Sequence, residues 1–531
     1  MMRRAALLGC LWLLVAAACG PGGGAPPDTV RFNLAADPTN LNPLFLHQDA
    51  NSVEQQIARL AFEPFVDLDA RGRAVPALLS EIPTVANGGI SADGRTLTYH
   101  LRKNVRWSDG VPVDSGDVLF TLHAILDPKN PVRSHEGYDL IDRAAAPDAH
   151  TVVFHLSRAW APAVMTYFSY GFAPQFVLPA HVLRSQEPLA QAAFNAAPTV
   201  GDGPYTFVAW HRGDNLRYVA NPRYWRGKPQ IARLDISIAP DPQTNLVMLR
   251  SGQLDWNLIA PVQKAQLEGS PGIGFVSVAT SVIAGLVINT THPPYDDVRV
   301  RRAFAMSIDR ATISKKITLG AYPVTDMLQP QFSWAYDPNV KEPGFDPAGA
   351  ARLLDAAGWL RGPDGIRHKG GQRLELTYVQ FPETVTGVRT ATIAQAELRS
   401  AGFDVTLKSI SSAQLYLPRT GTLASGKFDV AYVPFTMGAD PDDSSILGCN
   451  GASNYARWCD ARVDALESRA LSAQTQSNRK ALYGQIARIV AQNVPILYLF
   501  NASYPYAYRT RLHGFSPNAF LPTWNAATWR L

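Results

Sequence analysis

Residues 93–113 read DGRTLTYHLRKNVRWSDGVPV, a sequence with the composition and turn signals of paired β-strands. Within it, residues 96–102 place apolar side chains at every second position, as does the later segment 151–156. This spacing predicts half-buried strands, because successive side chains of a strand point to opposite faces. Asp/Gly and Pro/Asp pairs beside the two segments are turn signals. Trp107 and Asp109 are expected to hold a hairpin together.

Amphipathic helices are predicted further along the chain. Asp346-Pro347 opens a segment in which four apolar residues share one helical face, and Gly358 ends it as a C-cap glycine does. Similar patterns predict helices over residues 390–402 and over about 478–493. Because strands and helices are mixed in a long chain, we expect an α/β protein with mixed α+β sheets.

The N-terminus has the organisation of an export signal. Two arginines precede an apolar run over residues 5–15, which is too short to remain as a membrane-spanning helix. Small residues then lead to Cys19. We therefore expect residues 1–18 to be removed as a signal peptide and Cys19 to become the acylated first residue of a lipoprotein. The alternative is a plainly secreted protein that is cut at the same bond.

A tether and a location follow from that interpretation. Residues 19–28 are expected to form a lipid-anchored flexible tether, because they are rich in Gly and Pro and lack apolar periodicity. The folded body would then be extracytoplasmic, in the periplasm or cell envelope, and attached to the membrane through Cys19. The remaining roughly 500 residues exceed the ~250–300 at which one hydrophobic core stops growing, so two or more domains are expected.

Charge and hydropathy exclude some partners. The formal net charge is +5, and loss of the two N-terminal arginines leaves +3, which is too weak and dispersed to predict a nucleic-acid surface. No later segment offers eighteen uninterrupted apolar residues, so no further membrane span is expected.

Two cysteines remain after the signal peptide and the anchor are set aside, Cys449 and Cys459. In an oxidising compartment they are expected to form a disulfide. The alternative is a metal pair, but zinc sites favour shorter spacings and need further ligands. We expect no metal and no cofactor.

Five strings in a fixed order give the chain a recognisable resemblance over residues 29–531. They are DPTNLNP at 37–43, FEPFV at 62–66, the stretch 93–113, GDGPY at 201–205 with NPRYWRG at 221–227, and DVRVRRAF at 297–304 with SIDR at 307–310. In these strings the chain resembles the extracytoplasmic solute-binding proteins of ABC transporters, the peptide, dipeptide and nickel-binding family (family 5).

The resemblance implies a two-lobed periplasmic-binding-protein-like fold with a hinge. Lobe one would comprise residues 29–278 plus 502–531, with an extra subdomain at about 66–190. Lobe two would comprise residues 279–501. A solute would bind in the cleft between the lobes, and closure of the hinge would enclose it.

The resemblance also implies ligand-binding residues. The segment 427–433 has a strand pattern and leads to Met437, Gly438 and Asp440. In peptide-binding members an aspartate after this strand pairs with the ligand's α-ammonium group, and Asp440 fits that place; a buried carboxylate is tolerable when a cation joins it. The alternative is a solvated acidic turn. Met437 stands where the family often has Trp, so the pocket wall differs.

Arg389 is the second candidate. Dipeptide-binding members carry an arginine near this turn that holds the ligand's carboxylate, and a guanidinium at a helix start suits that anion. The alternative is a surface arginine.

The function implied is capture of a peptide or similar small solute and its delivery to ABC permease subunits, which work with a separate ATPase. The protein is expected to be a monomer and not an enzyme, since the sequence has none of the common hydrolase or phosphate-loop motifs. Alternatives are a nickel chelate, an oligosaccharide or another non-peptide solute, and a secreted hydrolase that uses Asp442 and Asp443.

Overall fold

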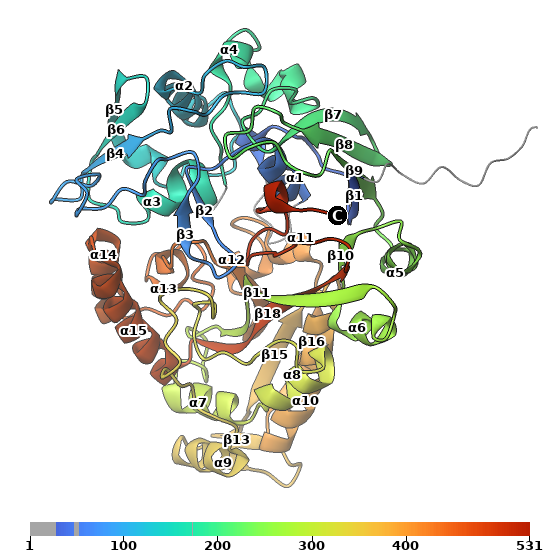
Figure 1. Cartoon of the computed structure of the whole chain (residues 1–531). Coiled ribbons are helices and arrows are strands. Elements are labelled where there is room, and N and C mark those ends of the chain that lie inside the picture. Colours follow the sequence, from blue (N-terminus) through green and yellow to red (C-terminus); the bar gives the residue numbers. More distant parts are fainter. Residues whose placement is uncertain (1–27, 47–52, 172–173) are drawn as a thin grey trace, which may run out of the picture.

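The structure is a computed structural model that describes residues 28–46, 53–171 and 174–531 (Figure 1). The predicted signal peptide over 1–18, Cys19 and nearly all of the tether lie outside the described residues. Within the described part the strands form five sheets, and helices pack on them. This arrangement confirms the predicted mixed α+β class. No helix in the described ranges has the length and apolar character needed to cross a membrane.

The largest sheet is mixed and has six strands. Their order is β10 (Trp256–Leu258), β18 (Ile496–Arg509), β11 (Ile273–Ile288), β17 (Val430–Thr436), β15 (Glu375–Gln380) and β16 (Asp404–Ser409). The first four pair antiparallel, whereas β15 is parallel to both β17 and β16.

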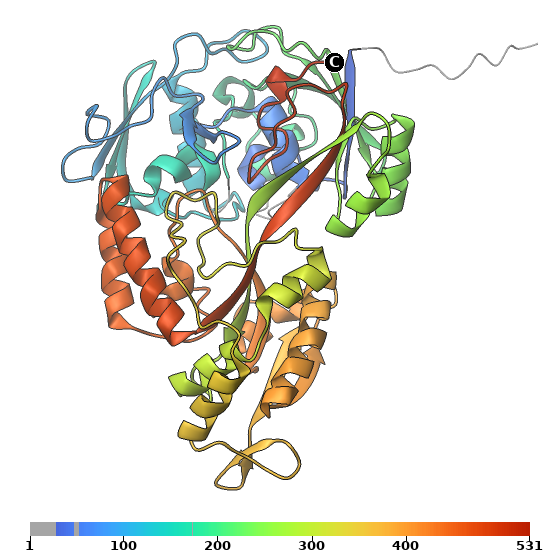
Figure 2. The ribbon, with the colours of Figure 1, turned by 60° about the horizontal axis from the view of Figure 1, so that its bottom comes forward.

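Strands β11 and β18 form the long twisted ribbon in the middle of Figure 2. Their pairing runs from Ile273 opposite Arg509 to Val287 opposite Ile496, with a shift of register between Ala279 and Ile283. At this shift the amide of the buried Asn501 donates hydrogen bonds to two carbonyls of β11, those of Thr280 (2.8 Å) and Val282 (3.0 Å). A side chain therefore replaces part of the backbone ladder in the middle of the ribbon.

The strands predicted from residues 93–113 and 151–156 are present. They are β4 (Thr96–His100) and β6 (Thr151–Leu156), which pair antiparallel with Thr96 opposite His155. The expected hairpin is also confirmed, because the backbone N–H of Trp107 donates to the carbonyl of Val111 at 2.8 Å. The other strands are β1 (Thr29–Leu34), β2 (Val66–Leu68), β3 (Ala74–Pro76), β5 (Ile141–Asp148), β7 (Tyr205–His211), β8 (Asn215–Ala220), β9 (Arg233–Ile238), β12 (Leu360–Arg361), β13 (Arg367–Lys369) and β14 (Gln372–Arg373).

In the described part of the first half of the chain the α-helices are α1 (Val53–Ala61), α2 (Ser115–Leu126), α3 (Ala163–Met165), α4 (Ala180–Leu183), α5 (Pro242–Ser251) and α6 (Pro261–Leu267). Those of the second half are α7 (Val298–Met306), α8 (Arg310–Thr318), α9 (Pro347–Ala356), α10 (Val385–Ala401), α11 (Ser412–Leu415), α12 (Thr422–Ser425), α13 (Ser444–Leu447), α14 (Ala461–Ser472) and α15 (Gln476–Asn493). The three predicted helices correspond to α9, α10 and α15.

Helix α10 begins earlier than predicted. It starts at Val385 rather than Thr390, so Arg389 lies inside the helix and not on a turn before it. The early turn contains Gly387, which lowers helix propensity and hides the turn from a sequence pattern. It forms because the helix packs closely on β17 there: a Cβ at Gly387 would lie 3.0 Å from the ring of Tyr432.

Two large hydrophobic cores divide the molecule at the β11 and β18 ribbon. The first core contains buried residues between 30 and 256 and between 506 and 529, whereas the second contains residues between 283 and 500. Val278 and Tyr504 pack on the first core, whereas Ile283 and Phe500 belong to the second. The chain therefore passes from one core to the other along these two strands.

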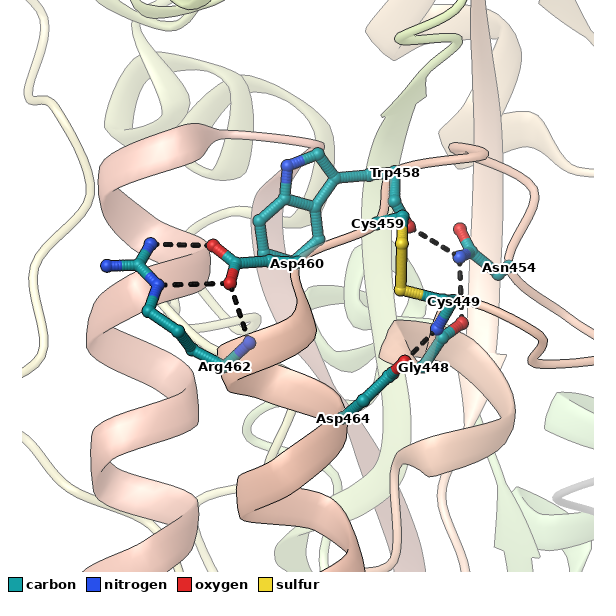
Figure 3. The surroundings of a disulfide bond; sticks show 8 residues. All are labelled: Gly448, Cys449, Asn454, Trp458, Cys459, Asp460, Arg462 and Asp464. Atoms are coloured by element: carbon teal, nitrogen blue, oxygen red, sulfur yellow. Dashed lines mark hydrogen bonds and ion pairs between the residues drawn. A yellow bond between two sulfur atoms is a disulfide. The ribbon is translucent and has the colours of Figure 1, made fainter.

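Cys449 and Cys459 form the expected disulfide, with an S–S distance of 2.07 Å (Figure 3). The backbone N–H of Cys449 donates to the carboxylate of Asp464 in α14 at 2.8 Å. The amide of Asn454 donates to the carbonyls on either side of the bridge, those of Gly448 (2.9 Å) and Trp458 (2.7 Å). The disulfide thus closes a loop that hydrogen bonds already shape.

Replacing both Cys449 and Cys459 with Ser should lower the free energy of unfolding by about 3 kcal/mol, the value expected for a closed loop of this size. Urea denaturation of the oxidised wild type and of the double variant measures the difference. The reduced wild type is the control and should match the variant. A loss below about 1 kcal/mol would show that the bridge does not constrain the unfolded chain.

Candidate functional site

A cavity of about 250 Å³ lies between the two cores, and we call it the cleft cavity. One side comes from segments packed on the first core, and the other from β17, the loop after it and two tyrosines. Its lining residues include Arg133, Glu136 and Tyr170 on the first side and Tyr416, Met437, Gly438, Asp440, Asp442 and Tyr455 on the second. Both sides contribute polar groups, so a bound solute would contact both halves of the molecule.

Strand β17 positions the loop that forms one wall. It pairs with β11 on one side and β15 on the other, which places its C-terminal end beside the crossing ribbon. The backbone N–H of Met437 donates to the carbonyl of Ser281 at 2.9 Å, and the Met437 side chain is buried. The chain then turns through Gly438 and reaches Asp440. Three predicted site residues, Met437, Gly438 and Asp440, therefore line one cavity.

The carboxylate of Asp440 already has a cationic partner within the chain. Both of its oxygens accept hydrogen bonds from the guanidinium of Arg479 at 2.6 Å. Asp440 is 8% exposed and Arg479 6%. Arg479 lies in α15 and donates further to the carbonyl of Ala470 (3.0 Å) and to the hydroxyl of Tyr483 (3.1 Å). Asp440 is thus not a solvated acidic turn, and its role toward a ligand stays a prediction.

Two other carboxyl groups in the cleft cavity lack such a cation. Glu136 comes from the first-core side and keeps part of its surface exposed, and its pKa is raised to about 7 by the burial of the remainder in the cavity and then by the negative charges of Asp442 and Asp440. Burial likewise raises the pKa of Asp442, whose carboxylate accepts hydrogen bonds from the N–H (3.0 Å) and hydroxyl (2.6 Å) of Ser444. Burial first, and then the neighbouring negative charges, disfavour the ionised forms of Glu136 and Asp442, and a cation in the cavity would favour them.

Behind this loop a second pair of carboxyl groups is buried without a cation. Asp443 and Glu467 are 4% and 3% exposed. The amide of Gln329 donates to one Asp443 oxygen at 3.0 Å, but the other oxygen and both oxygens of Glu467 have no donor among the described residues apart from a proton held between the two carboxyl groups. Burial raises the pKa of Asp443 to about 6 and raises that of Glu467 as well, so the two groups share a proton.

This arrangement bears on the hydrolase alternative. A glycosidase needs two carboxyl groups that face each other across an open groove. Asp442 lines the cleft cavity, whereas Asp443 is buried against Gln329 and Glu467. Asp442 and Asp443 are therefore not placed as such a pair.

Arg389 lines a different cavity, of about 630 Å³, which we call the Arg389 cavity. Its other lining residues include Ile259, Val262, Ile317, Tyr322 and Tyr504. The Arg389 side chain is exposed and makes no hydrogen bond or ion pair with any residue in the described ranges. The structure therefore does not bring Arg389 and Asp440 into one cavity.

Glu136 and Arg479 are site residues that the sequence analysis missed. Glu136 follows no motif, because it stands in an irregular segment that only the fold brings opposite Asp442. Arg479 had a signal. It lies three residues before Leu482 and seven before Ile486, so it shares the buried face of the predicted helix, where an arginine needs an acidic partner.

Among the residues that the structure describes, no group of three or more His, Cys, Asp or Glu side chains could hold a metal ion. The lining of the cleft cavity includes neither His nor Cys.

Comparisons with known proteins place these features in context. The family model of bacterial extracellular solute-binding proteins, family 5, matches residues 74–456. The chain is 29% identical to protein XP55 of Streptomyces lividans over 93% of its own length and 87% of that protein. It is also 29% identical to di/tripeptide-binding protein 2 of Pseudomonas aeruginosa, over 95% of each chain.

Solved structures share the fold. The oligopeptide-binding protein AppA of Bacillus subtilis, in complex with a nonapeptide, superimposes with a TM-score of 0.74 at 20% identity, covering 95% of this chain and 98% of AppA. NikZ of Campylobacter jejuni, in complex with Ni(L-His), gives a TM-score of 0.77 at 23% identity and covers 95% of this chain and all of NikZ. These likenesses confirm the predicted two-lobed fold.

The buried carboxyl pair predicts how stability changes with pH. The folded pKa values of Asp443 and Glu467 are raised, so the folded state keeps a proton that the unfolded chain releases above about pH 4. The two carboxyl groups therefore contribute to the free energy of unfolding at acid pH. This contribution is lost as the pH rises from their pKa values in the unfolded chain toward their raised pKa values in the folded protein. Glu467→Gln should flatten the decline in unfolding free energy between pH 5 and 7 by about 1–3 kcal/mol, measured by urea denaturation at each pH.

Glu268→Gln is the matched control, since Glu268 is exposed and far from the pair in sequence. It should leave the pH profile of the wild type unchanged. Parallel profiles for Glu467→Gln and wild type would show that the two carboxyl groups do not share a proton.

Proposed function

The chain belongs to the bacterial extracellular solute-binding proteins, family 5, and we propose that it captures a peptide or a similar small solute with a cationic group in the cleft cavity. Its role in ABC import is to deliver that solute to permease subunits that work with a separate ATPase. The relative in Pseudomonas aeruginosa that is named a di/tripeptide-binding protein supports this solute class.

One observation carries the proposal: carboxyl groups from both sides face the same cavity without enough cations to neutralise them. Glu136 approaches from the first-core side, and Asp440 and Asp442 from the other. The α-ammonium group of a peptide supplies one positive charge and three N–H donors. It would lower the pKa of Glu136 and hold the two sides together, because each side contributes part of its coordination.

A ligand carboxylate needs a cation, and two arginines are candidates. Arg133 is exposed at the cleft cavity itself. Arg389, the residue expected from family resemblance, lines the Arg389 cavity and has no partner among the described residues. We propose Arg133 for a ligand that fits within the cleft cavity and Arg389 for one that extends beyond it. Met437 and Gly438 are proposed as wall contacts.

Closure would occur about the crossing ribbon. We propose lobe one as residues 29–278 plus 502–531, with a subdomain at about 66–190, and lobe two as 279–501. The register shift between Ala279 and Ile283 supports these boundaries, since a hinge needs a point where the backbone ladder is already interrupted.

The protein is also proposed to act as a monomeric lipoprotein of the cell envelope without enzymatic activity. Its signal peptide would be residues 1–18 and its anchor Cys19, with the tether over 19–28.

A metal chelate is the second candidate solute, because NikZ was solved with Ni(L-His). The cleft lining disfavours it. It includes no His or Cys to complete the coordination of a nickel ion.

N-acetylation of a dipeptide should weaken its binding to the wild type by roughly 30-fold or more, because it removes the ammonium charge that the cleft carboxylates balance. Isothermal titration calorimetry of the full-length chain with free and N-acetylated Ala-Ala measures the ratio of dissociation constants. Equal affinities would rule out a cation site, and no binding of either peptide would favour a non-peptide solute.

Glu136→Gln is the variant matched to this test. It should weaken binding of the free dipeptide by up to about fivefold, the range of a partly exposed ion pair, and leave the acetylated one unaffected. The affinity of wild type should rise with pH between 6 and 7, because a bound cation lowers the raised pKa of Glu136, whereas at higher pH the α-amino group of the peptide itself begins to lose its proton. The variant should show a flatter dependence.

Cys19→Ser should release the folded protein from the membrane fraction without changing peptide affinity, because the acyl chains are attached at this residue alone. Fractionation of cells that express each form, followed by immunoblotting, measures the distribution. A variant that stays in the membrane fraction would exclude the lipoprotein interpretation.

A further inference from the structure

We propose that Arg479 is an internal counter-ion that the ammonium group of a ligand displaces from Asp440, so that Arg479 sets the affinity and selectivity of the site for cationic ligands. This inference rests on the proposed function, which places a cationic solute in the cleft cavity. Asp440, the predicted ammonium ligand, already accepts two hydrogen bonds of 2.6 Å from Arg479.

The hydrogen-bonding capacity of Asp440 explains why the two cations compete. One carboxylate oxygen accepts from Arg479 and from the backbone N–H of Asp442 at 3.1 Å, which uses both of its lone pairs. The other accepts from Arg479 and has one lone pair left. An ammonium group could gain only one bond while Arg479 stays, and the charge of Asp440 would already be neutralised. Full recognition therefore requires the guanidinium to withdraw.

A place for the displaced guanidinium exists on the other side of Asp440. Arg479 lines a cavity of about 660 Å³ between the two cores, which we call the Trp334 cavity, and Asp440 lines both this and the cleft cavity. The ion pair is thus the partition between two cavities. In its present position the guanidinium carbon already lies 5.4 Å from the ring centre of Trp334, which lines this cavity, and 5.6 Å from that of Tyr483, so the cation can move toward the Trp334 ring without leaving aromatic contact.

The exchange leaves each buried charged group with hydrogen-bond partners. Asp440 would pass from Arg479 to the ligand, while Arg479 would retain the carbonyl of Ala470 and the hydroxyl of Tyr483. A buried carboxylate without a cation is strongly unfavourable, so the free protein needs Arg479 at this position. The same arrangement lowers the apparent affinity for every cationic ligand, because the form with Asp440 free is only a fraction of the population.

A selectivity follows. A ligand with an ammonium group can take the place of Arg479, whereas a ligand without one meets a neutral ion pair and gains nothing from Asp440. Arg479 is therefore a specificity-determining residue that acts without touching the bound solute.

Arg479→Met tests the competition, because methionine fills similar space but carries no charge. The affinity of the full-length chain for free Ala-Ala should rise about tenfold or more, as expected when the competent form becomes the only one, while the affinity for N-acetyl-Ala-Ala should stay within about twofold. Isothermal titration calorimetry with both peptides measures the ratio of their dissociation constants. Arg479→Lys, which retains a charge but cannot form two parallel bonds, should give an intermediate rise and serves if the Met variant does not fold.

Two controls separate this effect from others. Arg488→Met removes an exposed arginine of the same helix, which pairs with Asp337 at 2.7 Å, and should change neither affinity. The double variant Asp440→Asn with Arg479→Met removes both charges. The gain in affinity for the free peptide seen in Arg479→Met should then disappear, because the carboxylate that the ammonium group would bind is absent.

The outcomes are distinct. An equal fall in affinity for both peptides in Arg479→Met would overturn the inference and make Arg479 a residue that merely positions Asp440. An unchanged affinity would overturn it as well. A wild type that binds neither peptide would instead reject the proposed function, and with it this form of the inference.

Discussion

The antiparallel pairing of β11 and β18 is the constraint on which the rest of the structure depends. The two strands run through both hydrophobic cores, so the elements between them in sequence belong to the second core and nearly all others to the first. Their register cannot slip by one residue, because a slip would turn every buried side chain to the opposite face. At residues 280–282 the ladder gives way to the amide of Asn501, which holds the strands together where the backbone does not.

This crossing also creates the cleft. Each core is closed by its own apolar side chains, so the surfaces that face each other between them are free to carry polar groups. Strand β17 pairs with β11 close to the crossing, and the loop after it is held there by the bond from Met437 to Ser281. The loop is therefore fixed relative to the crossing strands, while Glu136 and Arg133 belong to the opposite wall.

The carboxyl groups in and around the loop after β17 are accommodated in three different ways. Asp440 is buried and paired with Arg479, whereas Asp443 and Glu467 are buried and share a proton. Glu136 and Asp442 keep contact with the open cavity and carry charge that the chain does not fully balance. Only this last solution leaves a carboxyl free for a ligand without rearrangement. The chemistry of the lining, not the fold, thus decides which solute suits the site.

Local sequence determined much of this protein. The strands β4 and β6, the helices α9 and α15 and the disulfide follow from alternation, helical periodicity, capping residues and cysteine count, all of which act over short distances. The strings shared with a known family added the two-lobed fold and pointed to the loop that contains Asp440. Tertiary structure alone decided the rest. The first turn of α10 forms through packing of Gly387 on Tyr432, which moved Arg389 into the helix and into another cavity. The partner of Asp440 lies 39 residues away and Glu136 about 300 residues away, so no local pattern could join these charges; their distances depend on how two separate cores meet across one pair of strands.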